Sequence, residues 1–202
     1  MSRRQERQSK KNHPRVLKGL PMRQSFLIFC EGPTESGYFS SFKKKTRVLR
    51  GGNALKIVEE AIIQKEKETK EVDQYWVVFD KDETASKDFD QAIKLAVSNN
   101  IKVAWSNQAF ELWIILHYQD FFSPCDRRRY KEILCKYIKD YSASEKGEDQ
   151  GRRLHAQTPN MIQKAIDRAI KGHSLFEEKL LPSGRESSTT VFELVNAILK
   201  NQ

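Results

Sequence analysis

The sequence predicts an α/β protein with a four-stranded, mostly parallel sheet flanked by helices, followed by a helical C-terminal extension. Between residues 25 and 120, short apolar runs rich in aromatic and β-branched residues alternate with amphipathic segments. This β-α-β-α-β-α-β order is typical of parallel strands joined by crossover helices. Beyond Pro124 the apolar residues follow only helical spacing. We therefore expect three parts: a basic flexible tail (1–24), an α/β core (25–120) and a helical extension (121–202).

The strands are expected at 25–30, 46–50, 74–79 and 101–105. The first is an apolar run stopped by Gly32-Pro33, which is typical of a buried strand. The second is weaker and ends at Gly51-Gly52. The run Tyr75-Trp-Val-Val-Phe79 makes the third strand the clearest of the four.

Helices are expected to follow each strand. The first begins at Thr34, the second runs from an Asn53 cap to about residue 70, and the third runs from a Ser86 cap to about residue 99. A fourth covers 110–118. In the extension, apolar stripes at 130–141, 162–170 and 191–198 predict three more helices. The inward stripes include Val97, Tyr137 and Ile170. The polar segment 142–157 is expected to be a mobile loop.

The net charge of +9 is unevenly distributed. Residues 1–24 carry +7, residues 25–120 carry −2 and residues 121–202 carry +4. Basic flanks attract polyanions such as nucleic acid. Acidic residues that converge attract divalent cations.

Several classes of protein are unlikely on composition. No apolar run is long enough to span a membrane, and the charged N-terminus lacks the apolar stretch of a secretory signal. Cys30, Cys125 and Cys135 have no CxxC spacing, which fits a reducing cytoplasm. The four histidines are scattered, so no zinc site is indicated. We expect a cytoplasmic protein with no membrane partner.

Acidic residues follow three of the expected strands. Glu31 ends the first strand, Asp80 and Asp82 end the third, and Glu111 lies one turn into the helix after the fourth. Sites in parallel α/β sheets form at the carboxyl ends of the strands. Since residues two apart in extended backbone point the same way, Asp80 and Asp82 are expected to face one cavity. Two close carboxylates repel unless a cation lies between them, and Mg²⁺ prefers carboxylate oxygens.

The motifs resemble those of a known family. Glu31 after an apolar strand, followed by an Asp-x-Asp strand end, resembles the metal-dependent Toprim domain. The fuller pattern resembles the RloB-like family: Phe29-Cys-Glu-Gly-Pro-Thr-Glu35, Trp76-Val-Val-Phe-Asp-Lys-Asp82, Ser106-Asn-Gln-Ala-Phe-Glu111 through His117, and Ser188-Thr-Thr-Val191. Gln108-Ala109 departs from the family pattern, which has Pro and a small residue after the Asn.

This resemblance implies a Toprim-like catalytic core and a Mg²⁺- or Mn²⁺-dependent nuclease that acts in bacterial anti-phage defence with an ATPase partner. A homo-oligomer is a separate expectation. Asp80 and Asp82 would hold the metal, and Glu31 would be a ligand or the general acid or base. Glu111 would complete the site. The alternative is a non-catalytic component that binds metal or nucleic acid within a defence complex.

Other residues have two interpretations each. Glu35 and Glu111 are either site acids or helix N-terminal acids that favour the helix dipole. Ser106 and Asn107 either bind a phosphate, orient Glu111 or cap the helix. His117 is about 120° around the helix from Glu111, so a shared metal site does not follow.

Two basic clusters are candidate nucleic-acid contacts. Arg127, Arg128, Arg129 and Lys131 begin a helix, and Arg152-Arg153 lies in the expected polar loop. Each phosphate contact would add to the salt dependence of binding. The alternative for both clusters is a solvated helix or loop surface.

Overall fold

The computed structural model describes residues 23–49, 53–139, 141 and 147–201. It contains one four-stranded sheet of β1 (Phe26–Cys30), β2 (Lys45–Val48), β3 (Gln74–Asp80) and β4 (Lys102–Ser106). The strand order is β2-β1-β3-β4 and every pairing is parallel. The predicted α/β class and its four strands are confirmed, and the sheet is parallel throughout. The expected tail, up to residue 22, lies outside the described residues.

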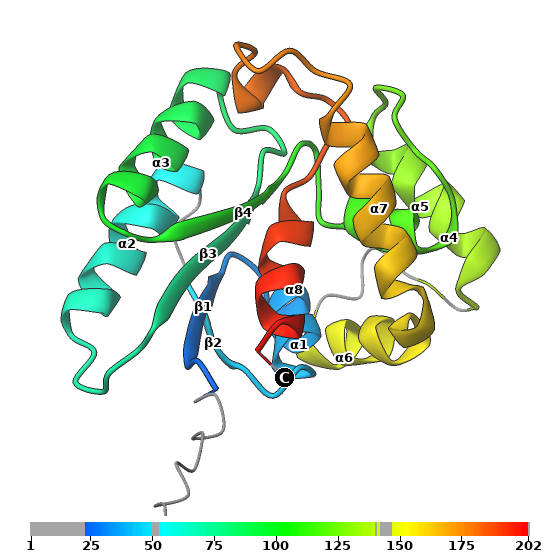
Figure 1. Cartoon of the computed structure of the whole chain (residues 1–202). Helices are drawn as coiled ribbons and strands as arrows, with labels where there is room; N and C mark the ends of the chain where they lie inside the picture. The colour runs from blue at the N-terminus through cyan, green and yellow to red at the C-terminus, as the bar shows by residue number, and fades with distance from the viewer. Residues whose placement is uncertain (1–22, 50–52, 140, 142–146, 202) are drawn as a thin grey trace, which may run out of the picture.

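Helices cover both faces of the sheet (Figure 1). The helices are α1 (Pro33–Ser40), α2 (Ala54–Glu66), α3 (Ser86–Ser98), α4 (Glu111–Tyr118), α5 (Arg127–Tyr137), α6 (Glu148–Gln157), α7 (Ile162–His173) and α8 (Val191–Leu199), with short 3₁₀ turns η1 (Pro159–Met161) and η2 (Pro182–Gly184). Among these described helices, none combines the length and apolar character needed to cross a bilayer.

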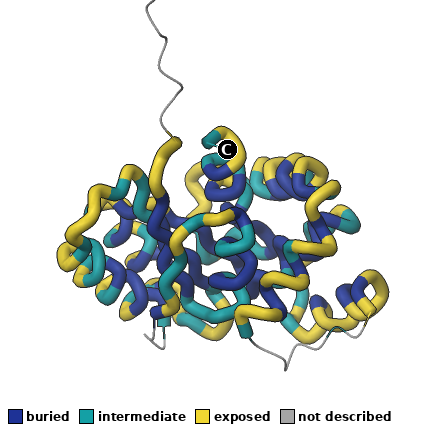
Figure 2. The backbone as a smooth tube through the Cα atoms, turned by 90° about the horizontal axis from the view of Figure 1, so that it is seen from below, coloured by how far each residue is buried: buried dark blue, intermediate teal, exposed yellow. Residues whose placement is uncertain are grey.

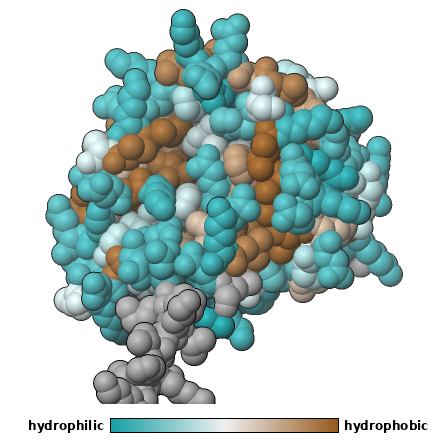
Figure 3. All heavy atoms as spheres, viewed as in Figure 1, coloured by the Kyte–Doolittle hydropathy of each residue, from teal (hydrophilic) through white to brown (hydrophobic). Residues whose placement is uncertain are grey.

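Two buried clusters lie on opposite faces of the sheet. Residues of α2 and α3 pack on Leu27, Phe29, Val77 and Phe79. The alternate residues of β1 and β3 face a larger cluster with α1, α4, α5, α7 and α8. This is the alternation that strands covered on both sides require. Figure 2 shows buried segments in the interior and more exposed segments around them, and Figure 3 shows a mainly hydrophilic surface crossed by apolar strips.

The C-terminal helices are part of this larger core. Tyr130, Leu134, Ile166 and Leu194 are at most 2% exposed and belong to the same cluster as the sheet residue Ile28. The extension therefore covers one face of the sheet. Its separation from the core at residue 120 stays a prediction about domain organisation.

Several local expectations differ from the structure. Residues 148–157 form α6, so the expectation of a loop over 142–157 is wrong there; residues 142–146 lie outside the described residues. The propensity of this polar segment is overridden by packing of Leu154, which is 3% exposed. Ser86 is the first residue of α3 rather than its cap. Asn53 does cap α2, since its Oδ1 accepts from the Lys56 N–H at 3.0 Å.

Three residues of the predicted inward stripes are exposed. Val97, Tyr137 and Ile170 are 61%, 44% and 46% exposed. Tyr137 is only partly covered, since its ring stacks on Tyr118 and its hydroxyl donates to Gln119 Oε1 at 2.9 Å. The helical periodicity correctly identifies the helices, but it cannot say how wide a face the core covers.

Candidate functional site

A cavity of about 290 Å³ lies at the carboxyl ends of β1 and β3 and gathers acidic side chains from several elements. Glu31 follows β1, Asp80 ends β3 and Asp82 lies two residues beyond it. Glu35 and Glu111 enter from the first turns of α1 and α4. The structure thus brings together all five acidic residues that the sequence singles out.

Backbone hydrogen bonds hold Asp80 at the centre of this cluster. The Asp80 N–H donates to Glu31 Oε2 at 3.0 Å, which connects the ends of β1 and β3. The Phe110 N–H donates to Asp80 Oδ2 at 3.0 Å. The other carboxylate oxygen, Oδ1, is buried with no hydrogen-bond partner among the described residues. A buried acceptor without a donor is costly, and it commonly marks a place where an ion or water binds.

The surroundings of Asp80 favour its neutral form. Burial raises the pKa of the Asp80 carboxyl well above its ordinary value, and the neighbouring Glu35, Glu31 and Glu111 raise it further. The hydrogen bond from Phe110 acts in the opposite direction. A positive ion in the cavity would offset this repulsion and return Asp80 to its ionised form.

Asp82 reaches the cavity by a different geometry from the one expected. β3 ends at Asp80, and Asp82 adopts a left-handed backbone conformation with φ of 39°. The argument from extended alternation is therefore wrong for this residue. Its placement depends on the Asp82 N–H, which donates to the Gln108 carbonyl at 2.9 Å. The loops after β3 and β4 are thereby tied together.

Arg127 lies against these carboxylates and supplies a cation. Its Nη1 is 2.6 Å from Asp82 Oδ2, and its Nη2 is 3.9 Å from Glu111 Oε1. Arg127 lines the same cavity. The sequence predicts that Arg127 binds phosphate as part of a basic cluster. The structure instead places Arg127, the first residue of α5, in the acidic site.

Three further polar side chains, which the sequence does not predict as site residues, line the site or lie beside it. Tyr141 Oη donates to Glu111 Oε1 at 3.4 Å. Thr34 Oγ1 donates to Gln150 Oε1 at 3.3 Å, which joins α1 to α6 at the cavity wall. No sequence signal points to Gln150, because it lies in the segment expected to be a loop. Tyr141 lies in the apolar stripe of a predicted helix, so its spacing predicts a core residue rather than a hydrogen-bond donor to Glu111.

Gly32 makes the approach of Glu35 possible. A Cβ at position 32 would collide with the Glu35 carboxylate. Gly32 is also the N-cap residue of α1, which begins with Pro33 at its first position. The Glu-Gly-Pro sequence therefore ends β1, starts α1 and leaves room for a second carboxylate.

Ser106 and Asn107 lie outside the acidic cavity. Ser106 Oγ is 3.1 Å from Thr189 Oγ1, and Asn107 Nδ2 donates to the carbonyls of Pro182 and Ser183 at 3.1 Å. Both residues are 1% exposed and neither lines the cavity. They attach the segment 182–190 to the end of β4, where Ser106 and Thr189 form an antiparallel bridge. The N-cap residue of α4 is Phe110, so Asn107 does not cap that helix.

His117 is part of the core rather than of the acidic cavity. Its Nδ1 is 2.9 Å from the Trp113 carbonyl and its Nε2 is 3.4 Å from Tyr38 Oη. Burial lowers the pKa of His117 to about 4, so the ring is neutral near pH 7. The Tyr38 hydroxyl also accepts from the Trp113 indole N–H at 3.0 Å. This network positions α4 against α1.

The other basic candidates lie on the outside of α5. Arg128 is paired with Asp126 at 3.0 Å, Arg129 with Glu132 at 2.5 Å, and Lys131 is exposed. In α6, Arg152 pairs with Glu148 and Asp149, both at 3.1 Å. These local pairs partly neutralise the basic run.

The donor set fits a hard divalent cation. Carboxylate oxygens are the ligands that Mg²⁺ and Mn²⁺ prefer, and the buried Asp80 Oδ1 has no other described partner. As placed, however, no group of three or more His, Cys, Asp or Glu among the described residues is close enough to hold an ion. The site is therefore an acidic pocket closed on one side by Arg127.

Together, the parallel sheet and the pocket at its carboxyl edge define an α/β protein with a cluster of carboxylates at the usual position of a functional site. The family model described as RloB-like protein matches residues 26–198. The chain belongs to the RloB-like family, which confirms the resemblance seen in its motifs. No curated protein and no solved structure matches the chain.

Proposed function

We propose that this protein is a metal-dependent nuclease that hydrolyses phosphodiester bonds of DNA or RNA, as an effector in bacterial anti-phage defence under the control of an ATPase partner. The observation that carries the proposal is the buried, unpartnered Asp80 Oδ1 within a group of four other carboxylates. Family membership supports an association with defence. The Toprim-like motif order supports the choice of phosphodiester chemistry.

Asp80, Asp82 and Glu31 would hold Mg²⁺ or Mn²⁺. When bound, the metal would polarise the phosphate and stabilise charge on its oxygens. These side chains are not close enough together to coordinate one ion, so metal binding would require them to move closer. The Asp82–Arg127 pair would have to open, which makes Arg127 available for the substrate phosphate.

Glu31 has a second candidate role, in proton transfer, and Glu111 has a positioning role. Glu31 accepts the Asp80 backbone N–H through Oε2, which holds its carboxylate at the pocket wall. There it is suited to act as a general base for water or as an acid for the leaving oxygen. Glu111, held by Tyr141, would orient Arg127. Arg128, Arg129 and Lys131 would bind the flanking phosphates on the outer surface of α5.

A cleavage assay tests this proposal. The full-length protein is incubated with DNA and with RNA in Mg²⁺ or Mn²⁺, with and without a cognate ATPase. Asp80→Asn and Glu31→Gln are expected to abolish cleavage. Asp167→Asn is the matched control, because Asp167 is exposed on α7 and bonds only Gln163 among the described residues. Cleavage that persists in both site variants would refute the catalytic assignment.

One observation favours the alternative of a non-catalytic component. Arg127 already supplies a positive charge to Asp82 and Glu111, so the pocket is partly neutralised without a metal. In that case the protein binds the ATPase or nucleic acid, and it cleaves neither DNA nor RNA under any condition. Metal binding measured by calorimetry, with Asp80→Asn as control, tests the metal site, which both functions can use. A protein that binds Mg²⁺ and its ATPase but leaves DNA and RNA uncut favours this second function.

A further inference from the structure

A second and larger cavity lies at the amino ends of the parallel strands, whereas the acidic pocket lies at their carboxyl ends. It has a volume of about 830 Å³ and is lined at the amino ends of β1 and β2 by Arg23, Phe26 and Lys45. β1 has five residues, so its length separates the two cavities by about 16 Å. The size is within the range of small-ligand cavities in proteins.

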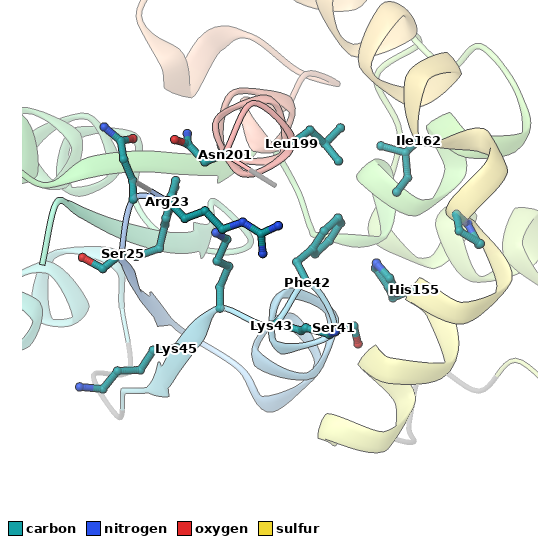
Figure 4. Close-up of a pocket in the computed structure, with 14 residues that line it drawn as sticks. Arg23, Ser25, Ser41, Phe42, Lys43, Lys45, His155, Ile162, Leu199 and Asn201 are labelled. Carbon is teal, nitrogen blue, oxygen red and sulfur yellow. The ribbon is translucent and has the colours of Figure 1, made fainter. Parts of the chain in front are cut away.

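The charged side chains among the described residues that line this cavity are all positive. Arg23, Lys43, Lys44 and Lys45 contribute to it, and no described acidic residue does. Lys45 is occupied by Glu68, at 2.7 Å, and in Figure 4 it points away from the centre. Within the part of the chain that the structure describes, the other three form no ion pair with a carboxylate. The cavity therefore holds a cation cluster without an acidic counterpart.

Lys44 is the best placed of these cations. Its Nζ is 4.5 Å from the centroid of the Phe26 ring, so the side chain lies against the strand end. Burial lowers the pKa of Lys44 below its ordinary value, and repulsion by the Arg23 guanidinium lowers it further. An anion between Lys44 and Arg23 would relieve this repulsion.

The opposite wall of the cavity is apolar and contains rings. Phe42 and His155 pack edge to face with centroids 4.4 Å apart, and Ile162 and Leu199 complete this wall. Figure 4 shows Phe42, from the end of α1, and Arg23 directed toward the same space, with His155 beyond on α6. Burial lowers the pKa of His155, so this ring is neutral near pH 7.

We propose that this cavity binds a nucleotide, with its phosphates at Arg23, Lys43 and Lys44 and its base against the wall formed by Phe42, Ile162 and Leu199. Cations supply the phosphate attraction, and an apolar, ring-bearing surface supplies contact area for a planar base. The chain preceding Arg23 adds seven basic residues and one acidic residue in residues 1–22. The basic composition of this segment is consistent with an anionic ligand for the protein.

The same nucleotide chemistry has two sources: a free nucleoside triphosphate or a residue of a nucleic-acid strand. The site does not depend on cleavage at the acidic pocket, which lies at the other edge of the sheet. Binding is therefore measured in EDTA, where no divalent metal is present. Calorimetry with the full-length protein compares ATP, inorganic tripolyphosphate and the oligonucleotide dT10.

The variant Arg23→Glu/Lys44→Glu reverses both charges. The matched control is Lys87→Glu/Lys94→Glu, which makes the same charge change at exposed positions of α3. Residues 1–22 are present in every variant, so the comparison isolates the cavity. Loss of two charge-assisted contacts is expected to weaken nucleotide binding at least about tenfold, while the control changes it less than about threefold. If the reversal unfolds the protein, Lys44→Met removes the charge and keeps the aliphatic contact with Phe26.

The probes distinguish the outcomes. Binding of ATP that is tighter than binding of tripolyphosphate supports a site for the free nucleotide. Binding of dT10 without binding of ATP supports a strand residue as the ligand. Equal binding of ATP and tripolyphosphate, with no binding of dT10, would overturn the nucleotide assignment. Absence of binding at millimolar ligand, or equal binding by the double variant and wild type, would overturn the site itself.

Discussion

Gly151→Ala tests the contact between α1 and α6, which joins the walls of both cavities. The two helices meet backbone to backbone at Gly151. A Cβ there would overlap the Thr34 carbonyl oxygen and lie 2.6 Å from the Tyr38 nitrogen. Both neighbours are backbone atoms within α1, so neither can rotate away.

The size of the effect follows from two opposing contributions. In a helix without this contact, Gly→Ala stabilises by about 1 kcal/mol. To restore a contact distance of about 3.5 Å to the Thr34 carbonyl oxygen, α6 must move away from α1 by roughly 1.5 Å. Overpacking of this kind typically costs about 1–3 kcal/mol, and here the obstacle is backbone, so we expect a net loss of about 2 kcal/mol. For a chain of this size, that corresponds to a melting temperature lower by roughly 4–8 °C.

Thermal unfolding followed by circular dichroism measures this change. Gly147→Ala is the control, since a Cβ at Gly147 meets nothing within 4 Å and the residue precedes the same helix. The control is expected to melt within about 2 °C of wild type. If Gly151→Ala melts at or above the wild-type temperature, the close approach of α1 and α6 is not present and the reasoning fails.

Three further predictions concern the acidic pocket and the core histidine. Asp80→Asn is expected to raise the melting temperature at pH 7: the folded-state pKa of Asp80 is raised, so its ionisation destabilises the fold as pH rises, and the gain over wild type should shrink toward pH 4. Arg127→Ala is expected to lower the melting temperature without metal, because Asp82 and Glu111 lose their compensating cation. It is expected to increase the stabilisation that about 10 mM MgCl2 gives in the same assay, relative to NaCl of equal ionic strength. An unchanged response to Mg²⁺ would contradict the role of Arg127. The pKa of His117 is about 4 in the folded protein, against an ordinary value of 6.5. As the pH falls from 6.5 to 4, the unfolded chain takes up a proton at His117 before the folded protein does. The free energy of unfolding is therefore expected to fall by about 3 kcal/mol over this range. Urea unfolding at the two pH values should give a shallower dependence for His117→Gln, and equal slopes would exclude His117 as the cause.

Much of the sheet and of the acidic site is predictable from local sequence. The strand runs are apolar because the strands are covered on both faces, and such runs are visible without any tertiary information. Glu31 and Asp80 directly follow these runs. Since parallel strands end at one edge, their meeting follows from the order of elements alone. Asn53 is found as a cap for the same reason: its interaction is with a backbone group three residues away.

Other parts of the site depend on contacts between distant segments. Arg127 appears in the sequence as one of three consecutive arginines, yet only this one reaches Asp82, because the start of α5 lies at the pocket. Gln150 lies in a polar segment whose helix is stabilised by packing on α1 rather than by its own composition. The strand order alone predicts that Ser106 and Asn107 face the site, but the returning segment 182–190 covers them.

The sequence by itself determined the parallel α/β core, the acidic strand ends and the family to which the chain belongs, because each is encoded in short runs of residues and in their order. Only the tertiary structure decided which charges neighbour one another. It placed Arg127 among the carboxylates, left Asp80 Oδ1 buried without a described partner, and assembled a cationic cavity from Arg23, Lys43 and Lys44. Electrostatic interactions depend on distance and burial in space, which spacing along the chain does not specify.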